Sequence, residues 1–395
     1  MGFPARLDIP APVLGIARTL HDAGYEAWCV GGSLRDTLLG HPQTDYDLAT
    51  SATPDEVQRL FPRTVAVGIK HGTVGVLDRE RKLHEVTTFR RDVLTDGRHA
   101  LVEYGVSLED DLARRDFTIN AIAYHPLRHE WRDPFAGERD LRAGLVRAVG
   151  APEQRFQEDF LRILRALRFA ARFDFVIDPA TWEAARAASS GLAQLSAERV
   201  REEWFKGLQT ARSIHRLVSL WIEVGAARVW LPELEQTASQ IKHLPEPEAD
   251  VRDAVLLTAL LMPKSSSVLA RLKSSNAQIA RAAALEAGPE QPAAFDEISV
   301  RRWMSEVGSA ADDLTEIWRL RNGREAPWSE TSKTIRGHGD PLARADLAID
   351  GSDLLALGVT GPAVGHILST LLERVLEEPR LNSREALLAL AKEMS

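Results

Sequence analysis

The pattern of apolar residues changes near residue 150, and this change limits the possible folds more than any other feature of the sequence. Before it, short β-rich runs alternate with helical ones, and we expect strands at residues 26–30, 46–49, 73–77 and 83–88. After it, apolar residues recur with helical period, which predicts helices over 156–172, 179–188, 197–208, 214–224, 251–261 and 381–394. Thr53, Pro54 and Glu56 predict a capping box, residues 90–105 predict a loop or hairpin, and the three prolines of residues 231–247 predict a break in the helical pattern. The sequence therefore predicts an α+β protein in which a head with a mixed β-sheet precedes an all-helical remainder.

Composition narrows the class of protein further. The chain has 395 residues, too many for one ordinary core, and it is 44% apolar and 27% charged, a balance typical of a globular protein. Cys29 is the only cysteine, which rules out a disulfide framework within the chain and argues against a cysteine-based zinc site. The formal net charge of −8 argues against nonspecific coating of nucleic acid. It does not exclude a nucleic-acid enzyme, because local charge decides binding.

Two features of the sequence bear on the location of the protein. Residues 1–12 lack the basic start and apolar run of a signal peptide. No stretch approaches the roughly 20 apolar residues that are needed to span a bilayer. We therefore expect a cytoplasmic protein that has no membrane partner.

The first group of residues with chemical potential is a Gly-Gly turn followed by two aspartates. Residues 31–36 (GGSLRD) place the turn before a short helix, where backbone N–H groups can approach a phosphate. Asp45 and Asp47 lie two residues apart and would share one face of a strand. Paired carboxylates can hold two divalent metals for phosphoryl transfer. An isolated Asp-x-Asp is more often a solvated turn, so only the ordered combination is specific.

Glu85 is a candidate third carboxylate. It falls on the predicted strand 83–88, which could lie beside the strand that carries the two aspartates. The alternative, a glutamate that faces solvent on an ordinary strand, remains open.

A second group, residues 114–121 (RRDFTINA), combines two arginines with an asparagine. The planar guanidinium of Arg115 is suited to phosphate, and Asn120 could bind a ribose hydroxyl. Taken alone, the same residues are more typical of a basic helix start that has an aspartate cap, a common surface feature.

A third group, residues 158–168 (EDFLRILRALR), forms an apolar stripe with arginines on the opposite side. Arginines at this spacing repel one another when nothing binds them, and a polyanion would relieve the repulsion. A solvated face on which acids supply partial counter-charge is the alternative. A fourth group, residues 196–203 (SAERVREE), is most simply a capped helix that supports its neighbour.

Together, in this order, the four groups resemble the class II tRNA nucleotidyltransferase family, which includes CCA-adding enzymes and bacterial poly(A) polymerases. The resemblance is dense from residue 27 to residue 208. It implies a polymerase-β-like nucleotidyltransferase head over residues 1–150. A helical neck that recognises the nucleotide base would follow over 151–210, and a helical body and tail that bind tRNA over 211–395.

The resemblance also implies roles for site residues. Asp45 and Asp47 would be the catalytic carboxylates that bind two Mg²⁺ ions. The expectation of Glu85 as a third catalytic acid comes from its strand position and not from the resemblance. The nucleotide contacts would be Gly32, Arg35, Arg115, Asn120, Asp159, Arg162, Arg165 and Arg168. Residues 133–137 (DPFAG) resemble the hinge motif of the family, but Ala136 stands where a glycine is common.

Base recognition by Asp159 and Arg162 has an independent chemical logic. Cytosine and adenine each offer an exocyclic amine beside a ring-nitrogen acceptor, so a carboxylate can accept from the amine while a guanidinium donates to the nitrogen. Guanine and uracil would set a carbonyl against the carboxylate, which should cost a few kcal/mol. We therefore expect addition of C, C and A to the 3′ end of tRNA from CTP and ATP, with no protein partner evident.

Other functions remain open. Members with partial specificity add only CC, only A, or poly(A). The loop 90–105, with Asp96-Gly97-Arg98, and the segment 67–73 (VGIKHGT) favour full CCA addition. A catalytically idle RNA-binding protein is a second alternative. Residues 256–263 (LLTALLMP) lack the His-Asp pair of a metal-dependent phosphohydrolase, so we expect no hydrolase activity.

Overall fold

The computed structural model describes residues 2–41, 43, 45–68, 72–95, 100–248 and 252–394. It divides the chain into two compact units, Met1–Glu235 and Gln236–Ser395. The finer division into head, neck, and body with tail stays a prediction. Two segments that the sequence links to specificity, 69–71 (IKH) and 96–98 (DGR), lie outside the described residues.

A mixed seven-stranded sheet forms the described part of the head, in the order β3-β4-β5-β2-β1-β8-β9. Strand β2 runs parallel to β5, whereas β1 runs antiparallel to both β2 and β8. The bounds are β1 (Ala27–Val30), β2 (Asp47–Thr50), β3 (Thr64–Gly68), β4 (Thr73–Leu77), β5 (Leu83–Thr88), β8 (Ala123–His125) and β9 (Glu130–Arg132). The predicted strands are confirmed to within two residues, and the expected hairpin is formed by β6 (Arg90–Thr95) and β7 (Ala100–Tyr104).

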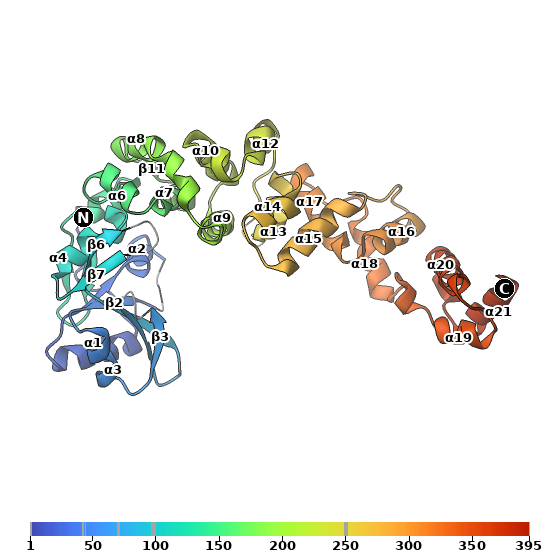
Figure 1. The fold of residues 1–395 in the computed structure, drawn as a ribbon, viewed down its shortest axis with the longest axis horizontal. Helices are drawn as coiled ribbons and strands as arrows, with labels where there is room; N and C mark the ends of the chain where they lie inside the picture. Colours follow the sequence, from blue (N-terminus) through green and yellow to red (C-terminus); the bar gives the residue numbers. More distant parts are fainter. Residues whose placement is uncertain are drawn as a thin grey trace. The chain divides into compact units, whose positions relative to one another are not determined.

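Short helices surround this sheet, and local sequence explains where they begin. The hydroxyl of Thr53 accepts from the Glu56 N–H while the Glu56 carboxylate accepts from the Thr53 N–H at 2.7 Å, so the predicted capping box is formed. The helices of the head are α1 (Ala11–Asp22), α2 (Gly32–Leu38), α3 (Pro54–Leu60), α4 (Leu108–Ala113) and α5 (Gly137–Arg142). Figure 1 follows the chain from the sheet, in blue, to the green helices that come next.

The helix predicted over 156–172 is broken in the structure. Two helices, α6 (Pro152–Glu158) and α7 (Leu161–Phe173), take the place of the single predicted helix. The Asp159 backbone is extended, and its carboxylate accepts from the Leu161 N–H at 3.0 Å, so this side chain competes with the helical ladder. The prediction of one continuous helix is therefore wrong at the residue that was expected to recognise the base.

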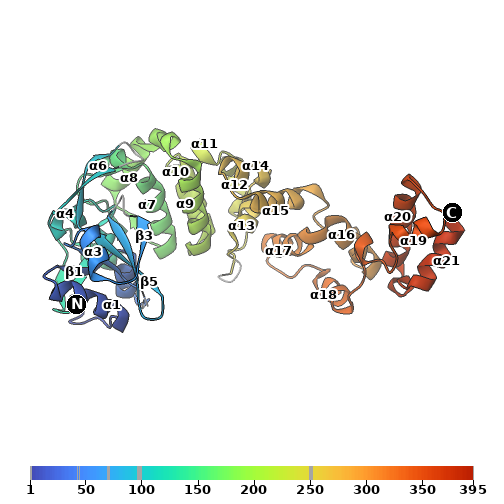
Figure 2. The same cartoon turned by 60° about the horizontal axis from the view of Figure 1, so that its bottom comes forward.

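Two further helices of the first unit pack against α7. Figure 2 shows α7, α9 (Ala197–Thr210) and α10 (Ile214–Glu223) side by side. Trp204 and Trp221 are both fully buried, and their rings meet edge to face at 5.2 Å. Smaller elements complete the unit, namely β10 (Leu145–Val146), β11 (Val176–Ile177), α8 (Pro179–Ala187) and α11 (Ala226–Trp230).

The described part of the second unit is helical. Its helices are α13 (Ala254–Leu261), α14 (Ser265–Arg271), α15 (Asn276–Ala287), α16 (Glu297–Val307), α17 (Ala311–Asn322), α18 (Ser329–His338), α19 (Gly351–Ala356), α20 (Pro362–Glu377) and α21 (Arg384–Met394). The sequence predicted a break over 231–247, but α12 (Glu233–Ile241) occupies most of it, because Pro232 precedes the helix and does not interrupt it.

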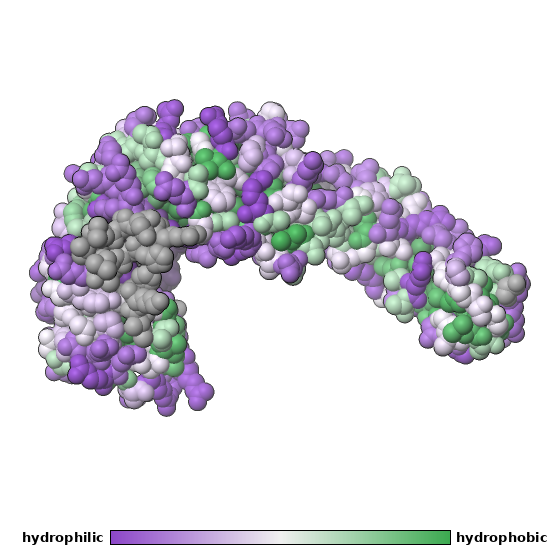
Figure 3. Space-filling view, in the orientation of Figure 1, coloured by the Kyte–Doolittle hydropathy of each residue, from purple (hydrophilic) through white to green (hydrophobic). Residues whose placement is uncertain are grey.

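No helix of the described residues is both long and apolar enough to cross a membrane. On the face drawn in Figure 3, hydrophobic residues form small separate groups instead of one continuous patch. Singly scattered apolar residues are ordinary on a protein surface.

The segment that resembles a hinge is tightly built. The Asp133 carboxylate accepts from the N–H groups of Gly137 at 2.7 Å and Glu138 at 3.0 Å. Ala136 has a φ of +56°, which an L-residue adopts at a cost, and a Cβ added at Gly137 would overlap the carbonyl oxygen of Thr118. The structure thus requires a glycine at 137 and would prefer one at 136.

These two positions predict opposite effects on stability. Gly137→Ala should lower the free energy of unfolding by about 1–3 kcal/mol, because the backbone near Thr118 must shift to admit a methyl group. Ala136→Gly should not destabilise, and relief of the left-handed conformation should add up to about 1 kcal/mol. Urea unfolding followed by tryptophan fluorescence measures both variants. Equal stability of the two variants would contradict this description of the segment.

Candidate active site

A cavity of about 560 Å³ in the first unit brings the predicted motifs together. The part of the chain that forms the sheet contributes the Gly31-Gly32 bend, residues of β2 and β5, and the arginine block, by which we mean residues 114–116. The helices α7 and α9 contribute the rest of the lining. Every predicted site residue except Asp45 lines this cavity, namely Gly32, Arg35, Asp47, Glu85, Arg115, Asn120, Asp159, Arg162, Arg165 and Arg168.

The Gly31-Gly32 bend lies directly against Asp47. Strand β1 ends at Val30, which pairs with Asp47 across the antiparallel ladder. Gly31 has a φ of +81°, and a Cβ there would lie 3.4 Å from Arg115 Nη1 and 3.6 Å from Asp47 Oδ2. A glycine is favoured here both by its backbone conformation and by the close approach of these two charged groups.

Asp47 and Glu85 lie next to one another on parallel strands. The pairing of Leu48 with Val86 places the preceding residues, Asp47 and Glu85, at adjacent positions on the cavity face. Partial desolvation among the groups of the cavity and the nearby Glu85 charge raise the pKa of Asp47 to about 6, although the residue keeps contact with solvent, and Arg115 opposes the shift. Carboxylates crowded together in this way are electrostatically strained until a cation neutralises them.

The donor set fits a divalent ion that also binds phosphate. Among the described residues, no three metal-ligating side chains form a complete site by themselves. Mg²⁺ is typically held by one or two carboxylates together with substrate phosphates and water, so a complete protein cage is not expected. Asp47 would supply a carboxylate ligand, Glu85 would add negative charge beside it, and the Gly31-Gly32 bend would receive the phosphates.

Asp45 differs from expectation. Strand β2 begins only at Asp47, so the two aspartates do not share a strand face as predicted. The Asp45 carboxylate is 50% exposed and lies outside the cavity lining, with Oδ1 at 2.9 Å from Nδ1 of the buried His84. The prediction that Asp45 lies on β2, on the same face as Asp47, is therefore wrong. The role of Asp45 as a metal ligand stays a prediction.

Arg115 presents an unsatisfied donor beside the bend. Its Nη2 pairs with Asp111 at 3.0 Å and its Nη1 donates to the Asn120 carbonyl at 3.4 Å. Its Nε is buried and lacks a hydrogen-bond partner among the described atoms. The Nη1 group beside Gly31 is suited to an anion bound in the cavity, whereas the buried Nε could donate to one only if the side chain moved.

Arg35 is held within the protein. Its side chain is 4% exposed, and its guanidinium lies 4.8 Å from the ring centres of both Phe169 and Phe173. Its Nη1 donates to the Asn120 side-chain oxygen at 2.6 Å, and its Nε donates to Asp36 at 2.9 Å. These contacts favour a role for Arg35 in positioning Asn120. Direct contact of Arg35 with a nucleotide phosphate stays a prediction.

Asp159 and Arg162, the predicted base-reading pair, do not bind one another in this structure. Asp159 Oδ2 accepts from Arg199 at 2.6 Å. Arg162 pairs with Glu158 at 2.6 Å and also donates to the carbonyls of Arg155 and Arg114. The sequence assigned Arg199 to a supporting helix only, and its contact with Asp159 could not be found without knowing how α7 and α9 pack.

The arginines of α7 are neutralised by acids from several elements. The ion pairs are Arg162–Glu158 at 2.6 Å, Arg165–Asp116 at 2.7 Å, Arg168–Glu203 at 2.6 Å and Arg172–Asp36 at 2.8 Å. The expectation that mutual repulsion on this face awaits a polyanion is therefore wrong. A ligand here must exchange with existing partners.

Asp116 connects the arginine block to the neck. Burial alone would raise its pKa, but the Arg165 guanidinium and the Asn120 amide outweigh burial and hold the pKa at about 2. Its two oxygens bind Asn120 at 2.8 Å and Arg165 at 2.7 Å. The sequence treated this residue only as a helix cap, yet it joins two of the predicted nucleotide contacts.

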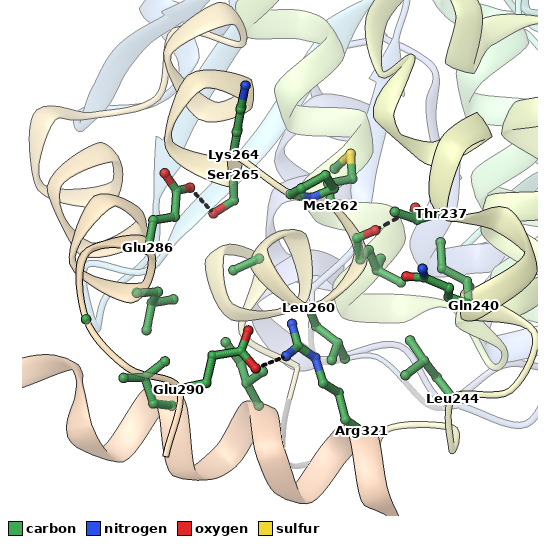
Figure 4. Close-up of a pocket in the computed structure, with 18 residues that line it drawn as sticks. Thr237, Gln240, Leu244, Leu260, Met262, Lys264, Ser265, Glu286, Glu290 and Arg321 are labelled. Carbon is green, nitrogen blue, oxygen red and sulfur yellow. Dashed lines mark hydrogen bonds and ion pairs between the residues drawn. The ribbon is translucent and has the colours of Figure 1, made fainter. Parts of the chain in front are cut away.

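A second and larger cavity, of about 800 Å³, lies in the second unit (Figure 4). Its lining is mainly apolar, and three of its charged side chains already have partners, with Arg321 paired to Glu290 at 2.7 Å and Glu286 accepting from Ser265 at 2.9 Å. It contains none of the predicted site residues. Its size therefore does not make it the better candidate for phosphoryl chemistry.

Comparisons with known proteins agree with this geometry. The model of the poly A polymerase head domain matches residues 27–147, and a model of the probable RNA and SrmB-binding site of polymerase A matches residues 174–237. The CCA-adding enzyme of Lactiplantibacillus plantarum is 33% identical over 99% of this chain and 97% of that protein. The CCA-adding enzyme of Streptococcus pyogenes serotype M5 is 38% identical over 97% and 96%.

A solved structure extends the likeness to three dimensions. The crystal structure of the Bacillus stearothermophilus CCA-adding enzyme in complex with CTP has a TM-score of 0.86 and 32% identity, covering 97% of this chain and 96% of that one. The predicted polymerase-β-like nucleotidyltransferase head, followed by helical domains, is confirmed.

The crowding of Asp47 predicts an inverted pH dependence of stability. Because the folded-state pKa is raised from 3.8 to about 6, the charged carboxylate costs stability above pH 6, and the cost vanishes below pH 4, where both states are protonated. Metal-free Asp47→Asn should therefore melt at a higher temperature than the wild type at pH 8 and at the same temperature at pH 4. Glu80→Gln, which alters an exposed acid of the same head, should leave the melting temperature unchanged at both pH values.

Differential scanning calorimetry in EDTA measures this difference, and repetition with Mg²⁺ should narrow it by stabilising the wild type alone. An Asp47→Asn variant less stable than the wild type at pH 8 would contradict the inferred carboxylate crowding.

Proposed function

Since the chain belongs to the family of CCA-adding enzymes, we propose that it adds C, C and A to the 3′ end of tRNA from CTP and ATP, without a nucleic-acid template. The observation that carries this proposal is the convergence of the Gly31-Gly32 bend, Asp47, Arg115 and Asp159 on one cavity. Two relatives that match this chain over nearly their whole length are named CCA-adding enzymes. These names favour full CCA addition over CC-only, A-only or poly(A) synthesis.

In the reaction, the tRNA 3′-hydroxyl attacks the α-phosphate of the bound nucleotide and pyrophosphate leaves. The backbone N–H groups at Gly32 and the guanidinium of Arg115 would bind the triphosphate, and Asn120 would lie near the ribose. Glu85 would strengthen the negative field at Asp47. Holding both reactants in line is the main contribution of the protein, because phosphoryl transfer depends on position and charge stabilisation.

Nucleotidyltransferases of this family are generally metal-dependent, and we assign the site to two Mg²⁺ ions held by Asp45 and Asp47. Bound there, the ions would lower the pKa of the attacking hydroxyl and neutralise charge on the leaving group. The raised pKa of Asp47 supports this assignment, since a carboxylate held near Glu85 gains most from a cation.

Selection of the base would require Asp159 and Arg162 to exchange partners. In the present structure Arg199 holds Asp159, and Glu158 holds Arg162. A cytosine or adenine amine would donate to the carboxylate and the ring nitrogen would accept from the guanidinium, with Arg165 and Arg168 bordering the same cavity. The CTP complex of the Bacillus stearothermophilus relative supports CTP as a substrate. We place the reaction in the cytoplasm, where both nucleotides and tRNA are available.

A direct test of the chemistry removes the carboxylates. Asp47→Ala and Asp45→Ala should each lower incorporation of CMP into unextended tRNA by at least about 10³-fold, since the charge that anchors the metal is lost. Circular dichroism should show an intact fold. Appreciable turnover by both variants would refute the metal assignment.

A test of base selection uses Asp159→Ala. The variant should lose most of its preference for CTP and ATP over UTP and GTP, a change of about 10²-fold or more in relative kcat/KM, because the acceptor for the exocyclic amine is gone. Single-nucleotide incorporation followed by 3′-end sequencing measures this ratio. It also separates CCA addition from CC-only, A-only and poly(A) synthesis. An unchanged ratio would show that another group reads the base.

A further inference from the structure

His84 lies next to Glu85 on β5 but points to the other face of the sheet. Side chains alternate along a strand, so Glu85 lines the cavity while the His84 side chain, only 1% exposed, is buried behind it. Its neighbours on this buried face, Val86 and Thr88, are nearly inaccessible to solvent. A polar ring in such a place is costly unless its nitrogens are hydrogen-bonded.

Both ring nitrogens of His84 contact carboxylates. Nδ1 lies 2.9 Å from Asp45 Oδ1, and Nε2 lies 3.1 Å from Asp78 Oδ2. Asp78 is a fixed anchor, because its other oxygen accepts from the N–H groups of Glu80 and Lys82, both at 2.9 Å. The hydrogen bond from His84 is the main cause that lowers the pKa of Asp78. The ring is thus held rigidly from its far side.

The contact at Nδ1, the other ring nitrogen of His84, fixes Asp45. This residue lies before β2 and outside its ladder, and among the described residues the His84 contact is the one hydrogen bond of its carboxylate. Only Oδ1 faces the ring, and the carboxylate remains 50% exposed. A hydrogen bond to one oxygen orients the group and leaves the other oxygen available for a cation, as outer-shell partners of metal ligands do.

We propose that His84 is a positioning residue for the transfer reaction: it holds one oxygen of Asp45 so that the other is presented to a divalent metal. This inference rests on the proposed function, in which Asp45 is a metal ligand. A purely structural reading, in which His84 only joins the β4–β5 turn to the sheet, depends on the Asp78 contact instead. The two contacts use different nitrogens and can therefore be separated.

Two matched substitutions separate them. In His84→Asn the side-chain nitrogen replaces Nδ1, so the bond to Asp45 is kept and the bond to Asp78 is lost. In His84→Gln the nitrogen replaces Nε2, so the bond to Asp78 is kept and the bond to Asp45 is lost. We expect His84→Gln to weaken Mn²⁺ binding about 10- to 100-fold and His84→Asn to bind Mn²⁺ nearly as the wild type does.

The experiment titrates the full chain with Mn²⁺ alone and follows free Mn²⁺ by electron paramagnetic resonance. The Mg²⁺ concentration at half-maximal CMP incorporation should rise in His84→Gln, with kcat largely recovered at saturating Mg²⁺. Asp78→Asn, which leaves the Asp45 contact in place, should keep wild-type Mn²⁺ affinity and provides a second test if His84→Gln does not fold. Equal Mn²⁺ affinity of His84→Gln and the wild type, or a loss of affinity in Asp78→Asn, would overturn the inference.

Asp45→Ala distinguishes failure of this inference from failure of the proposed function. If Asp45→Ala weakens Mn²⁺ binding but His84→Gln does not, only the positioning role is wrong. If neither variant weakens binding, the assignment of Asp45 as a metal ligand fails and the inference fails with it. In the Asp45→Ala background, His84→Gln should have no further effect on affinity.

Discussion

The antiparallel pairing of β1 with β2 is the constraint on which the site depends. It sets Val30 opposite Asp47, so the chain that turns at Gly31 must pass beside the carboxylate. The parallel pairing of β2 with β5 then adds Glu85 on the same face. Three short strands thereby bring a bend rich in N–H groups and two acids into one place. A one-residue slip in either ladder would turn an acid to the opposite face and destroy the arrangement.

The arginines around the cavity are already paired with acids in this structure. These acids come from the head, from α9 and from the junction between α6 and α7. The positive surface of the cavity is therefore not vacant, and a nucleotide that bound to Asp159 and Arg162 as proposed would have to displace their present partners. Exchange of this kind makes binding weaker than an empty charged pocket would give, and it makes binding sensitive to the fit of the base. Asp116 binds both Asn120 and Arg165, so the proposed ribose contact and a proposed base contact belong to one hydrogen-bonded network.

Sequence was sufficient for the parts of the fold that local rules decide. The capping box at Thr53, the strand that carries Glu85 and the glycine bend were all predicted, because turn chemistry and periodicity are local. The break at Asp159, the turn of Asp45 toward His84 and the pairing of Arg199 with Asp159 were not, because each depends on which distant element packs against the residue. Recognising that ten of the eleven predicted site residues would meet in one cavity required the order of the motifs, not any one of them.

The central claim is that Asp47, beside the Gly31-Gly32 bend, is where a divalent cation meets the triphosphate. A crystal of the full chain grown with CTP and Mn²⁺, and measured at the manganese absorption edge, tests this most directly. Anomalous density is expected next to the Asp47 carboxylate, with the CTP phosphates at the bend and the cytosine toward Asp159. Manganese and CTP bound elsewhere, for example in the cavity of the second unit, with the Asp47 site lacking both, would contradict it.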